Sequence, residues 1–253
     1  MPGFVSLLAA SAALKVASLN LCTDELLLLL ADDSQIASVT HLSAQPSETV
    51  LWQKARRHRI NDGSLLSVAP LKPDLVLTMG GGVRESGSIA RRLGIRVVVL
   101  PYPQSLSDIE ASIARVAFQI GKPDRGRQVL QQLAQLRRTA PKAGVDTIWL
   151  GGGGRSMAST GLASEWMRLA GLHQRRLQGD RVSLEQLLVS SPRVLLRSDY
   201  RVGEYSGEQR WMAHPLARRT RAGKTLATDG RRWTCMGPSL IPEIVRLRRE
   251  LAR

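Results

Sequence analysis

Residues of the types that usually perform catalysis or bind metal ions are few in this chain. It has two cysteines, Cys22 and Cys235, and four histidines. Cys22 with His41 is a conceivable nucleophile and base, and no serine stands in a GxSxG motif. The separations of Cys22, His41, Asp62 and Cys235 match no recognised spacing of metal ligands. We therefore expect a protein that is not an enzyme and has no cofactor and no resident metal ion.

The state of the two cysteines depends on the compartment in which the protein works. In an exported protein they could form one long-range disulfide, and in a cytosolic protein they would be buried thiols. Residues 1–14 are apolar and rich in small residues, and Ala10-Ser11-Ala12 resembles a signal-peptidase site, although a positively charged start is missing. We interpret this segment as a truncated export signal, the alternative being an ordinary N-terminal arm. No later apolar run approaches the roughly 20 residues needed to span a bilayer, so we expect a soluble mature protein without membrane insertion.

Two further features could contact a ligand. The run Gly151-Gly152-Gly153-Gly154-Arg155 lacks the order of a phosphate-binding loop, and no GxGxxG fingerprint opens the first strand–helix unit. We interpret the run as a flexible loop that borders a cleft. Trp233 lies in the polar stretch DGRRWTCMGP, where a tryptophan is either a lid on the core or an exposed flat platform for a ligand.

The chain is strongly basic. Its formal net charge is +15, with 36 Lys and Arg against 21 Asp and Glu, which would suit a nucleic acid or an anionic ligand. The basic residues are scattered over predicted helices, with a dense cluster only at 218–224, and aromatic residues make up 4% of the chain. Since base stacking needs aromatic side chains, we expect no nucleic-acid partner.

The elements that must position these residues alternate between strand and helix. Short β-branched runs predict strands at 16–19, 36–40, 75–79, 97–100 and 147–150. Predicted helices begin at Thr23 or Asp24, at Ser86, at the capping-box pair Ser107 and Glu110, and at Pro123. The last of these runs to Thr139 and would be roughly 25 Å long. Such alternation predicts a mostly parallel sheet covered on both faces.

An internal repetition indicates two lobes. SLLSVAPLKPDLVL (64–77) and SLEQLLVSSPRVLL (183–196) align without a gap, so that Pro73 matches Pro192. In each segment a serine opens a short helix, a proline ends it and a strand follows. The predicted fold class is α/β, with two Rossmann-like lobes (15–121 and 141–253), mostly parallel sheets, and a single long bridging helix (122–140).

Five segments in this order resemble the helical-backbone class of periplasmic binding proteins, which includes the cobalamin and ferric-siderophore receptors of ABC importers. They are VASLNLCTDELLLLL (16–30), NDGSLLSVAPLKPDLVLTMGGG (61–82), RRLGIRVVVLP (91–101), SLSDIEASIARVAFQIGKPDRGRQVLQQL (105–133) and RWTCMGPSLIPEIV (232–245). The resemblance implies a periplasmic, monomeric protein of two lobes that captures a metal chelate between them and delivers it to a permease. The expected ligand is a corrinoid, a ferric siderophore or haem.

Ligands of open parallel α/β sheets collect at the carboxyl ends of the strands. The ligand-binding candidates there are Asn20, Cys22, His41, Asp62, Gly81, Arg84, Tyr102, Arg155, Thr160, Tyr200, Arg201, Trp233 and Cys235. Three of them, Arg84, Arg155 and Arg201, would hold anionic groups. By resemblance, permease contacts are expected from Glu85 in the first lobe and from Glu165 or Glu208 in the second. Where cobalamin-binding members have further aromatics, this chain has His41-Leu42 and residues 79–82, which disfavours cobalamin.

Two alternatives concern the cysteines and the function. If 20–23 and 232–237 are facing cleft loops, Cys22 and Cys235 could approach each other, as a redox-sensitive latch or as a thiol pair that touches the chelate; otherwise they are unpaired on separate lobes. The alternative function is a soluble α/β enzyme, a transferase or reductase with its active site in the cleft. Such an enzyme would need an acid/base pair with perturbed pKa values in one pocket.

Overall fold

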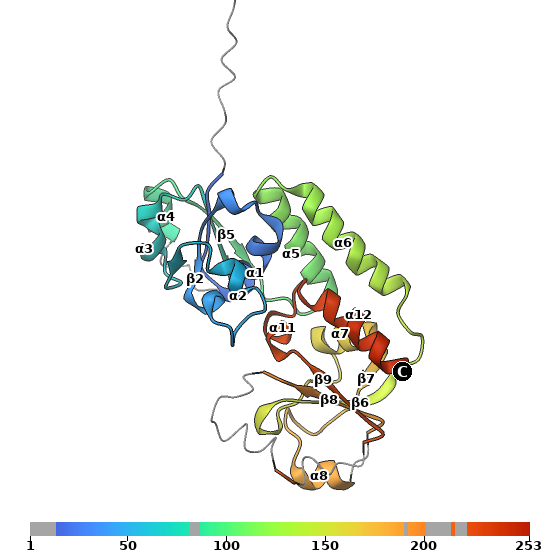
Figure 1. Ribbon diagram of the computed structural model, residues 1–253. Helices are drawn as coiled ribbons and strands as arrows, with labels where there is room; N and C mark the ends of the chain where they lie inside the picture. Colours follow the sequence, from blue (N-terminus) through green and yellow to red (C-terminus); the bar gives the residue numbers. More distant parts are fainter. Residues whose placement is uncertain (1–13, 81–86, 190–191, 201–213, 216–221) are drawn as a thin grey trace, which may run out of the picture.

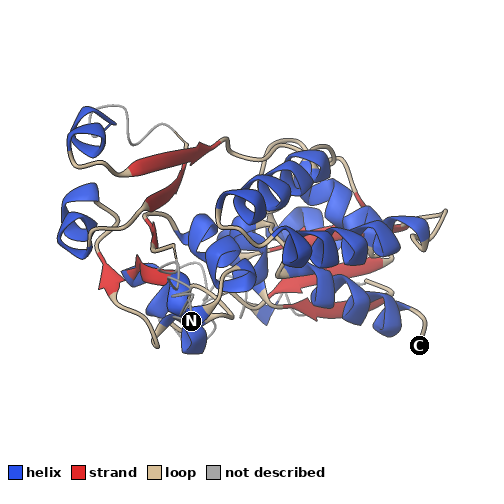
Figure 2. Ribbon diagram, turned by 90° about the horizontal axis from the view of Figure 1, so that it is seen from above, coloured by secondary structure: helices blue, strands red, loops and turns tan. Residues whose placement is uncertain are grey.

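The fold contains two separate parallel sheets. The computed structural model describes residues 14–80, 87–189, 192–200, 214–215 and 222–253. One sheet has the strand order β3-β2-β1-β4-β5 and the other β7-β6-β8-β9, and every pairing in both is parallel. The two sheets lie in different halves of the molecule (Figures 1 and 2). The predicted class, α/β with two lobes, is therefore confirmed.

Each lobe is defined by its sheet. The N-terminal lobe contains β1 (Val16–Ser18), β2 (Ile36–Thr40), β3 (Ile60–Asn61), β4 (Leu75–Met79) and β5 (Arg96–Leu100). The C-terminal lobe contains β6 (Val145–Leu150), β7 (Leu172–Gln174), β8 (Val194–Ser198) and β9 (Lys224–Thr228). If β6, β7, β8 and β9 are equated with β1, β2, β4 and β5, the two strand orders coincide, and only the edge strand β3 lacks a counterpart.

The repeated helix-proline-strand pattern accounts for this likeness. Ser64 caps α3 (Leu65–Val68) by accepting from the backbone N–H of Ser67, and β4 begins two residues after Pro73. Ser183 accepts from Gln186 at the start of α8 (Leu184–Val189), and β8 begins two residues after Pro192. Each segment thus builds the strand next to the first strand of its sheet.

Helices cover both faces of each sheet. Along β4, Leu75 and Leu77 face one hydrophobic cluster while Val76 faces another, as the alternation of a strand requires. In the N-terminal lobe one face carries α1 (Leu21–Leu30) and α5 (Leu106–Gln119), and the other carries α3 and α4 (Gly87–Arg92). In the C-terminal lobe one face carries α7 (Leu162–Leu169) and α12 (Leu240–Leu251), and the other carries α8. Two short helices, α2 (Trp52–Ala55) and α11 (Gly230–Cys235), lie near the boundary between the lobes (Figure 1).

The largest hydrophobic cluster is continuous across both lobes. It joins residues of α1 and α5 to residues of α7, α12 and β8, and α6 (Pro123–Arg138) contributes Leu133 and Leu136. The lobes therefore share one core, although each also has a small cluster of its own on its outer face.

The long helix α6 is attached to both lobes. Pro123 opens it as predicted, and its 16 residues make it about 24 Å long. On the N-terminal side, Lys122 and Arg125 both pair with Asp32. On the C-terminal side, Arg248 of α12 donates to the carbonyl of Leu136, 2.6 Å away.

Two helix starts differ from the prediction. α1 begins at Leu21, because Asn20 is extended (φ −149°, ψ 139°) and its side chain accepts from the N–H of Cys22. The predicted caps, Thr23 and Asp24, are instead buried in the first turn. α5 begins at Leu106, with Ser105 and Asp108 in a reciprocal capping box in place of Ser107 and Glu110. In both cases the backbone turns into the helix earlier than the side-chain pattern indicates.

Among the described residues, no helix has the length and apolar character that crossing a membrane requires.

Candidate functional site

A pocket lies at the carboxyl ends of β1 and β4, where the strand order of the first sheet changes direction. Such switch points are where open α/β sheets bind ligands. The pocket has a volume of about 470 Å³. Its lining residues are Leu19, Asn20, Gly63, Ser64, Leu65, Leu66, Thr78, Met79, Ile89 and Tyr102. Its lining exposes both polar and apolar surface, and its exposed large apolar side chains are Leu66, Ile89 and Tyr102, at 71%, 42% and 62%.

Gly80 and Tyr102 form the aromatic wall of this pocket. Gly80 follows β4 with φ +76°, a conformation that residues with a Cβ rarely adopt. A Cβ on Gly80 would overlap the ring of Tyr102, so the ring lies directly over the end of β4. Tyr102 is thus an exposed aromatic platform whose position depends on a glycine.

Asn20 and Asp62 hold the backbone beside the pocket. Asn20 caps α1 and lines the pocket as well. Asp62 is exposed, and its carboxylate accepts from the N–H of Ser64, 2.8 Å away. Hydrogen bonds from Ser64 and Ser67 lower the pKa of Asp62 to about 2. This carboxylate therefore stays ionised and holds the loop that carries Gly63 and Ser64 into the pocket.

In the C-terminal lobe, two tryptophans that are not part of the pocket lining lie against each other, Trp149 in β6 and Trp233 in α11. The rings of Trp149 and Trp233 meet edge to face, with centroids 6.3 Å apart. Trp233 is only 3% exposed, and its indole N–H donates to Thr228. Of the two alternatives for Trp233, the structure shows the core lid, and the expectation of an exposed platform is corrected. The stretch that was expected to be a loop winds into α11 and turns the ring inward.

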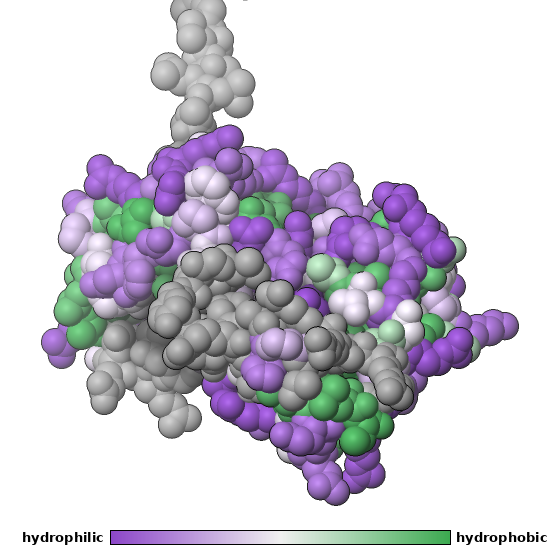
Figure 3. Space-filling view, turned by 60° about the horizontal axis from the view of Figure 1, so that its bottom comes forward, coloured by the Kyte–Doolittle hydropathy of each residue, from purple (hydrophilic) through white to green (hydrophobic). Residues whose placement is uncertain are grey.

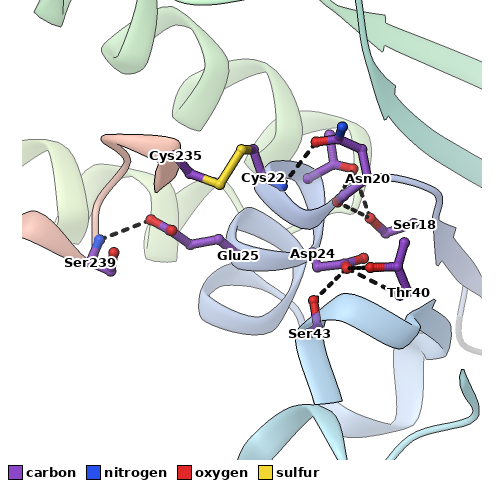
Figure 4. The surroundings of a disulfide bond; sticks show 10 residues. Ser18, Asn20, Cys22, Asp24, Glu25, Thr40, Ser43, Cys235 and Ser239 are labelled. Atoms are coloured by element: carbon purple, nitrogen blue, oxygen red, sulfur yellow. Dashed lines mark hydrogen bonds between the residues drawn. A yellow bond between two sulfur atoms is a disulfide. The ribbon is translucent and has the colours of Figure 1, made fainter. Parts of the chain in front are cut away.

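The two cysteines form a disulfide that joins the lobes. Cys22 in the first turn of α1 is bonded to Cys235 at the end of α11, with their Cα atoms 5.2 Å apart (Figure 4). Neither sulfur is a free thiol, so a Cys22–His41 nucleophile and a thiol pair on the chelate are both excluded. The residues beside the disulfide are Leu26, Met79, Ile109, Ser112, Gly237 and Pro238.

Two buried carboxylates stand on α1 beside the disulfide and point in opposite directions (Figure 4). Glu25 accepts from the backbone N–H of Ser239 in the other lobe at 3.0 Å, and burial raises its pKa. Asp24 accepts from Ser43 and from both the N–H and the hydroxyl of Thr40. Burial raises the pKa of Asp24 to about 6, against the lowering effect of these hydrogen bonds. Asp24 thus organises its own lobe, whereas Glu25 connects the two.

Further hydrogen bonds between described residues cross between the lobes. The hydroxyl of Tyr200 donates to Glu48 at 2.8 Å, and Arg231 donates to the carbonyl of Pro46 at the same distance. Glu165 of α7 accepts from the N–H of Leu106 at 2.7 Å and so caps α5 across the boundary. Glu165 was expected to face a permease, but its carboxylate is used inside the molecule.

The remaining predicted site residues are dispersed. His41 is exposed at the start of a short 3-10 helix (His41–Ala44) that follows β2, and Arg155 and Thr160 are exposed between β6 and α7. Gly81, Arg84, Glu85, Arg201 and Glu208 lie outside the described residues. Among the described residues, no three His, Cys, Asp or Glu side chains are close enough to hold a metal ion.

Several pocket residues were not predicted. Ser64, Leu65 and Leu66 belong to the repeated segment. The pattern that could have identified them is a capping serine followed by two leucines, of which Leu66 is exposed. Ile89 gave no signal, because an apolar residue in a helix is usually part of the core.

The face of the molecule drawn in Figure 3 is mostly hydrophilic, with apolar side chains gathered in small separate patches among the residues it colours. This distribution agrees with a formal charge of +15 that is spread over many helices.

The sequence matches the family model described as periplasmic binding protein over residues 16–226. A search of curated proteins found no match.

Solved structures share the fold. The periplasmic haem-binding protein RhuT from Roseiflexus sp. RS-1, in apo form, is 21% identical, with a TM-score of 0.67 over 93% of this chain and 97% of that one. The periplasmic vitamin B12 binding protein BtuF of Vibrio cholerae is 19% identical, with a TM-score of 0.64 over 95% and 97%. The siderophore binding protein BauB, bound to acinetobactin and ferric iron, is 14% identical, with a TM-score of 0.69 over 94% and 93%.

Proposed function

Because the chain belongs to the periplasmic binding protein family, a family of binding proteins rather than enzymes, we propose that it is the substrate-binding protein of an ABC importer. It captures a metal chelate between its two lobes and delivers it to a membrane permease. The ligand is a corrinoid, a ferric siderophore or haem. The protein acts in the periplasm as a monomer, with lobes at 15–121 and 141–253 connected by 122–140.

The observation that carries this proposal is a group of three exposed apolar side chains in the lining of the pocket at the ends of β1 and β4. Leu66, Ile89 and Tyr102 expose apolar surface there, which water solvates poorly and a large flat ligand would cover. The Tyr102 ring offers a face for offset stacking on a conjugated ring system. These side chains support a ligand with a large apolar face, such as a macrocyclic chelate. The names of RhuT, BtuF and BauB, which describe haem, vitamin B12 and siderophore binding, support the same class of ligand.

Charge supports an anionic ligand. Haem carries propionates and many siderophores carry carboxylates, and a protein of charge +15 attracts both. Arg155 is exposed at the end of β6, where its guanidinium suits a carboxylate. Arg84 and Arg201 are further candidates from the sequence, and His41 and Thr160 are candidates from exposed loops.

For the permease contact we propose Glu85 in the first lobe and Glu208 in the second. Glu165 is the weaker candidate, since its carboxylate already accepts from Leu106.

Titration of the purified protein with haem, a cobalamin and several ferric siderophores tests the proposal. The five tryptophans supply a fluorescence signal that a bound chelate should quench. We expect saturable binding of at least one chelate, and about a tenfold weaker affinity in Tyr102→Ala, or about 1.4 kcal/mol. Tyr102→Phe keeps the aromatic ring. It should bind the chelate nearly as well as wild type if Tyr102 contacts the ligand by ring stacking alone.

Phe118→Ala is the matched control, because Phe118 is an exposed ring on α5, outside the pocket, and is 74% exposed. The proposal is wrong if no chelate binds. The role of Tyr102 is wrong if Tyr102→Ala and Phe118→Ala bind equally well.

A further inference from the structure

We propose that the Cys22–Cys235 disulfide is a redox-sensitive tie that limits how far the two lobes can separate. The inference concerns motion of the protein itself and does not depend on which ligand is bound.

The disulfide closes a second covalent connection between the lobes. The chain passes from one lobe to the other through α6, and the disulfide joins α1 to α11 across 213 residues of sequence. The shared core and the hydrogen bonds that cross the boundary already hold the lobes together. The disulfide adds a covalent limit on how far the lobes can separate, which these contacts do not provide.

The disulfide sits where the lobes meet, behind the pocket. Cys22 is held by Asn20, whose side chain accepts from its N–H at 2.9 Å and which also lines the pocket. Met79, at the end of β4, borders both the disulfide and the pocket. Breaking the disulfide would therefore affect Asn20 and Met79, which lie beside it and also line the pocket.

The non-covalent contacts beside the disulfide form only when the lobes are positioned as the disulfide holds them. Glu25, three residues after Cys22, accepts from Ser239, four residues after Cys235. Gly237 lies against the carboxylate of Glu25 so closely that a Cβ would overlap it. The buried Glu25 would lose this partner if the lobes moved apart, so the disulfide protects a contact that is costly to break.

Reduction of the bond would release the tie. With dithiothreitol, the S–S bond breaks, each cysteine gains one electron and one proton, and the reagent closes to its cyclic disulfide. The lobes would then be held by the shared core, α6 and the hydrogen bonds that cross the boundary.

Interlobe distance is the direct test. A donor and an acceptor dye are attached through non-natural residues at Arg92 in α4 and Glu185 in α8, both exposed and on different lobes. We expect a narrow distance distribution in the oxidised protein, and a broader one shifted to longer distances after treatment with dithiothreitol. Cys22→Ala/Cys235→Ala should show the broad distribution with and without the reagent.

The controls distinguish a disulfide that limits lobe motion from one that only stabilises the fold. Peptide mapping without reductant must show Cys22 linked to Cys235, and free thiols there would overturn the proposal. Reduction should also lower the Tm by about 10 °C, as expected for a long closed loop. If reduction lowers the Tm but leaves the distance distribution unchanged, the bond stabilises the fold without limiting lobe motion, and the proposal is wrong. Should the double variant fail to fold, the comparison of oxidised and reduced wild type still decides.

Discussion

The carboxyl group of Asp24 illustrates how a single residue can make this fold depend on pH. Its side chain is fully buried and accepts three hydrogen bonds from Thr40 and Ser43, all on one oxygen. The other oxygen has no partner among the described residues. Burial without full compensation raises its pKa from 3.8 to about 6.

Folding therefore takes up a proton at Asp24 between pH 3.8 and about 6. The free energy of unfolding therefore falls as the pH rises through this window. Above the window, the buried ionised carboxylate lowers the free energy of unfolding by about 3 kcal/mol. Asp24→Asn keeps an oxygen that can accept from Thr40 and Ser43 and cannot ionise. We expect urea denaturation to show a flatter dependence of the free energy of unfolding on pH in this variant between pH 4 and 7.

Glu25 also has a raised pKa, and it contributes equally to the pH dependence of stability in wild type and in Asp24→Asn. The difference in pH dependence between the two proteins therefore reports on Asp24. Asp24→Ala should be less stable than Asp24→Asn at every pH, because Thr40 and Ser43 lose their acceptor. Equal slopes in wild type and Asp24→Asn would show that the carboxyl does not titrate in this window.

Gly80 offers a second prediction at the level of one residue. Gly80→Ala places a Cβ against the Tyr102 ring, and Gly94→Ala meets no atom within 4 Å although its φ of +69° is equally unfavourable. Both variants should lose about 1 kcal/mol of stability. Only Gly80→Ala should weaken chelate binding, by about tenfold, in the fluorescence titration. Equal affinity of the two variants would contradict the role of the ring.

At the scale of elements, the sequence predicted the strands best where they are buried on both faces. β2 and β4 have the predicted bounds, because continuous apolar or β-branched runs identify central strands. The short strands β3 and β7 were missed, since their two or three residues carry no periodicity, and the five-residue strand β9 was not predicted either. The starts of α1 and α5 were misplaced by a few residues, because the caps at Asn20 and Ser105 depend on backbone dihedral angles that sequence patterns only approximate.

The site could be predicted only in outline. Asn20 and Tyr102 were found because they follow strands whose carboxyl ends must meet. Whether Cys22 and Cys235 pair, and whether Trp233 faces the core, depend on packing across the whole chain, which no local pattern encodes.

The contact between α5 and α6 tests the packing of the bridging helix. A Cβ on Gly126 would lie 2.5 Å from the Cβ of Ala117, so the helices approach closely at this point. We expect Gly126→Ala to cost about 1–3 kcal/mol through overpacking, despite the better helix propensity of alanine.

Adding Ala117→Gly to Gly126→Ala returns the space, and the pair should recover part of the lost stability in a denaturation experiment. Simple additivity of the two single effects would show that the helices do not meet there as described.

The capping of α5 by Glu165 joins an element of each lobe. Glu165→Ala removes the acceptor for the N–H of Leu106 and should lower stability by about 1 kcal/mol, whereas Glu165→Gln retains an acceptor and should lose less. Denaturation of the isolated protein is the measurement. A variant that is as stable as wild type but defective in transport would restore Glu165 as a permease contact.

At the scale of the whole molecule, the two lobes pack together through a shared core, and the described lining of the pocket comes from the N-terminal lobe. Among the described residues they share a core, the helix α6, the Cys22–Cys235 disulfide and hydrogen bonds that cross the boundary. Such a molecule would bind a chelate with limited closure, because large separation of the lobes would expose apolar surface and break buried contacts. The high positive charge would act at longer range, in attracting an anionic ligand.

Hydrogen–deuterium exchange with and without the chelate found by titration tests the central claim most directly. The account predicts slower amide exchange at the strand ends that form the pocket, at residues 19–20, 63–66 and 78–80, and no change in α8 on the outer face. Slower exchange confined to α8, or unchanged exchange at the pocket in the presence of a saturating chelate, would contradict binding of the chelate at this pocket.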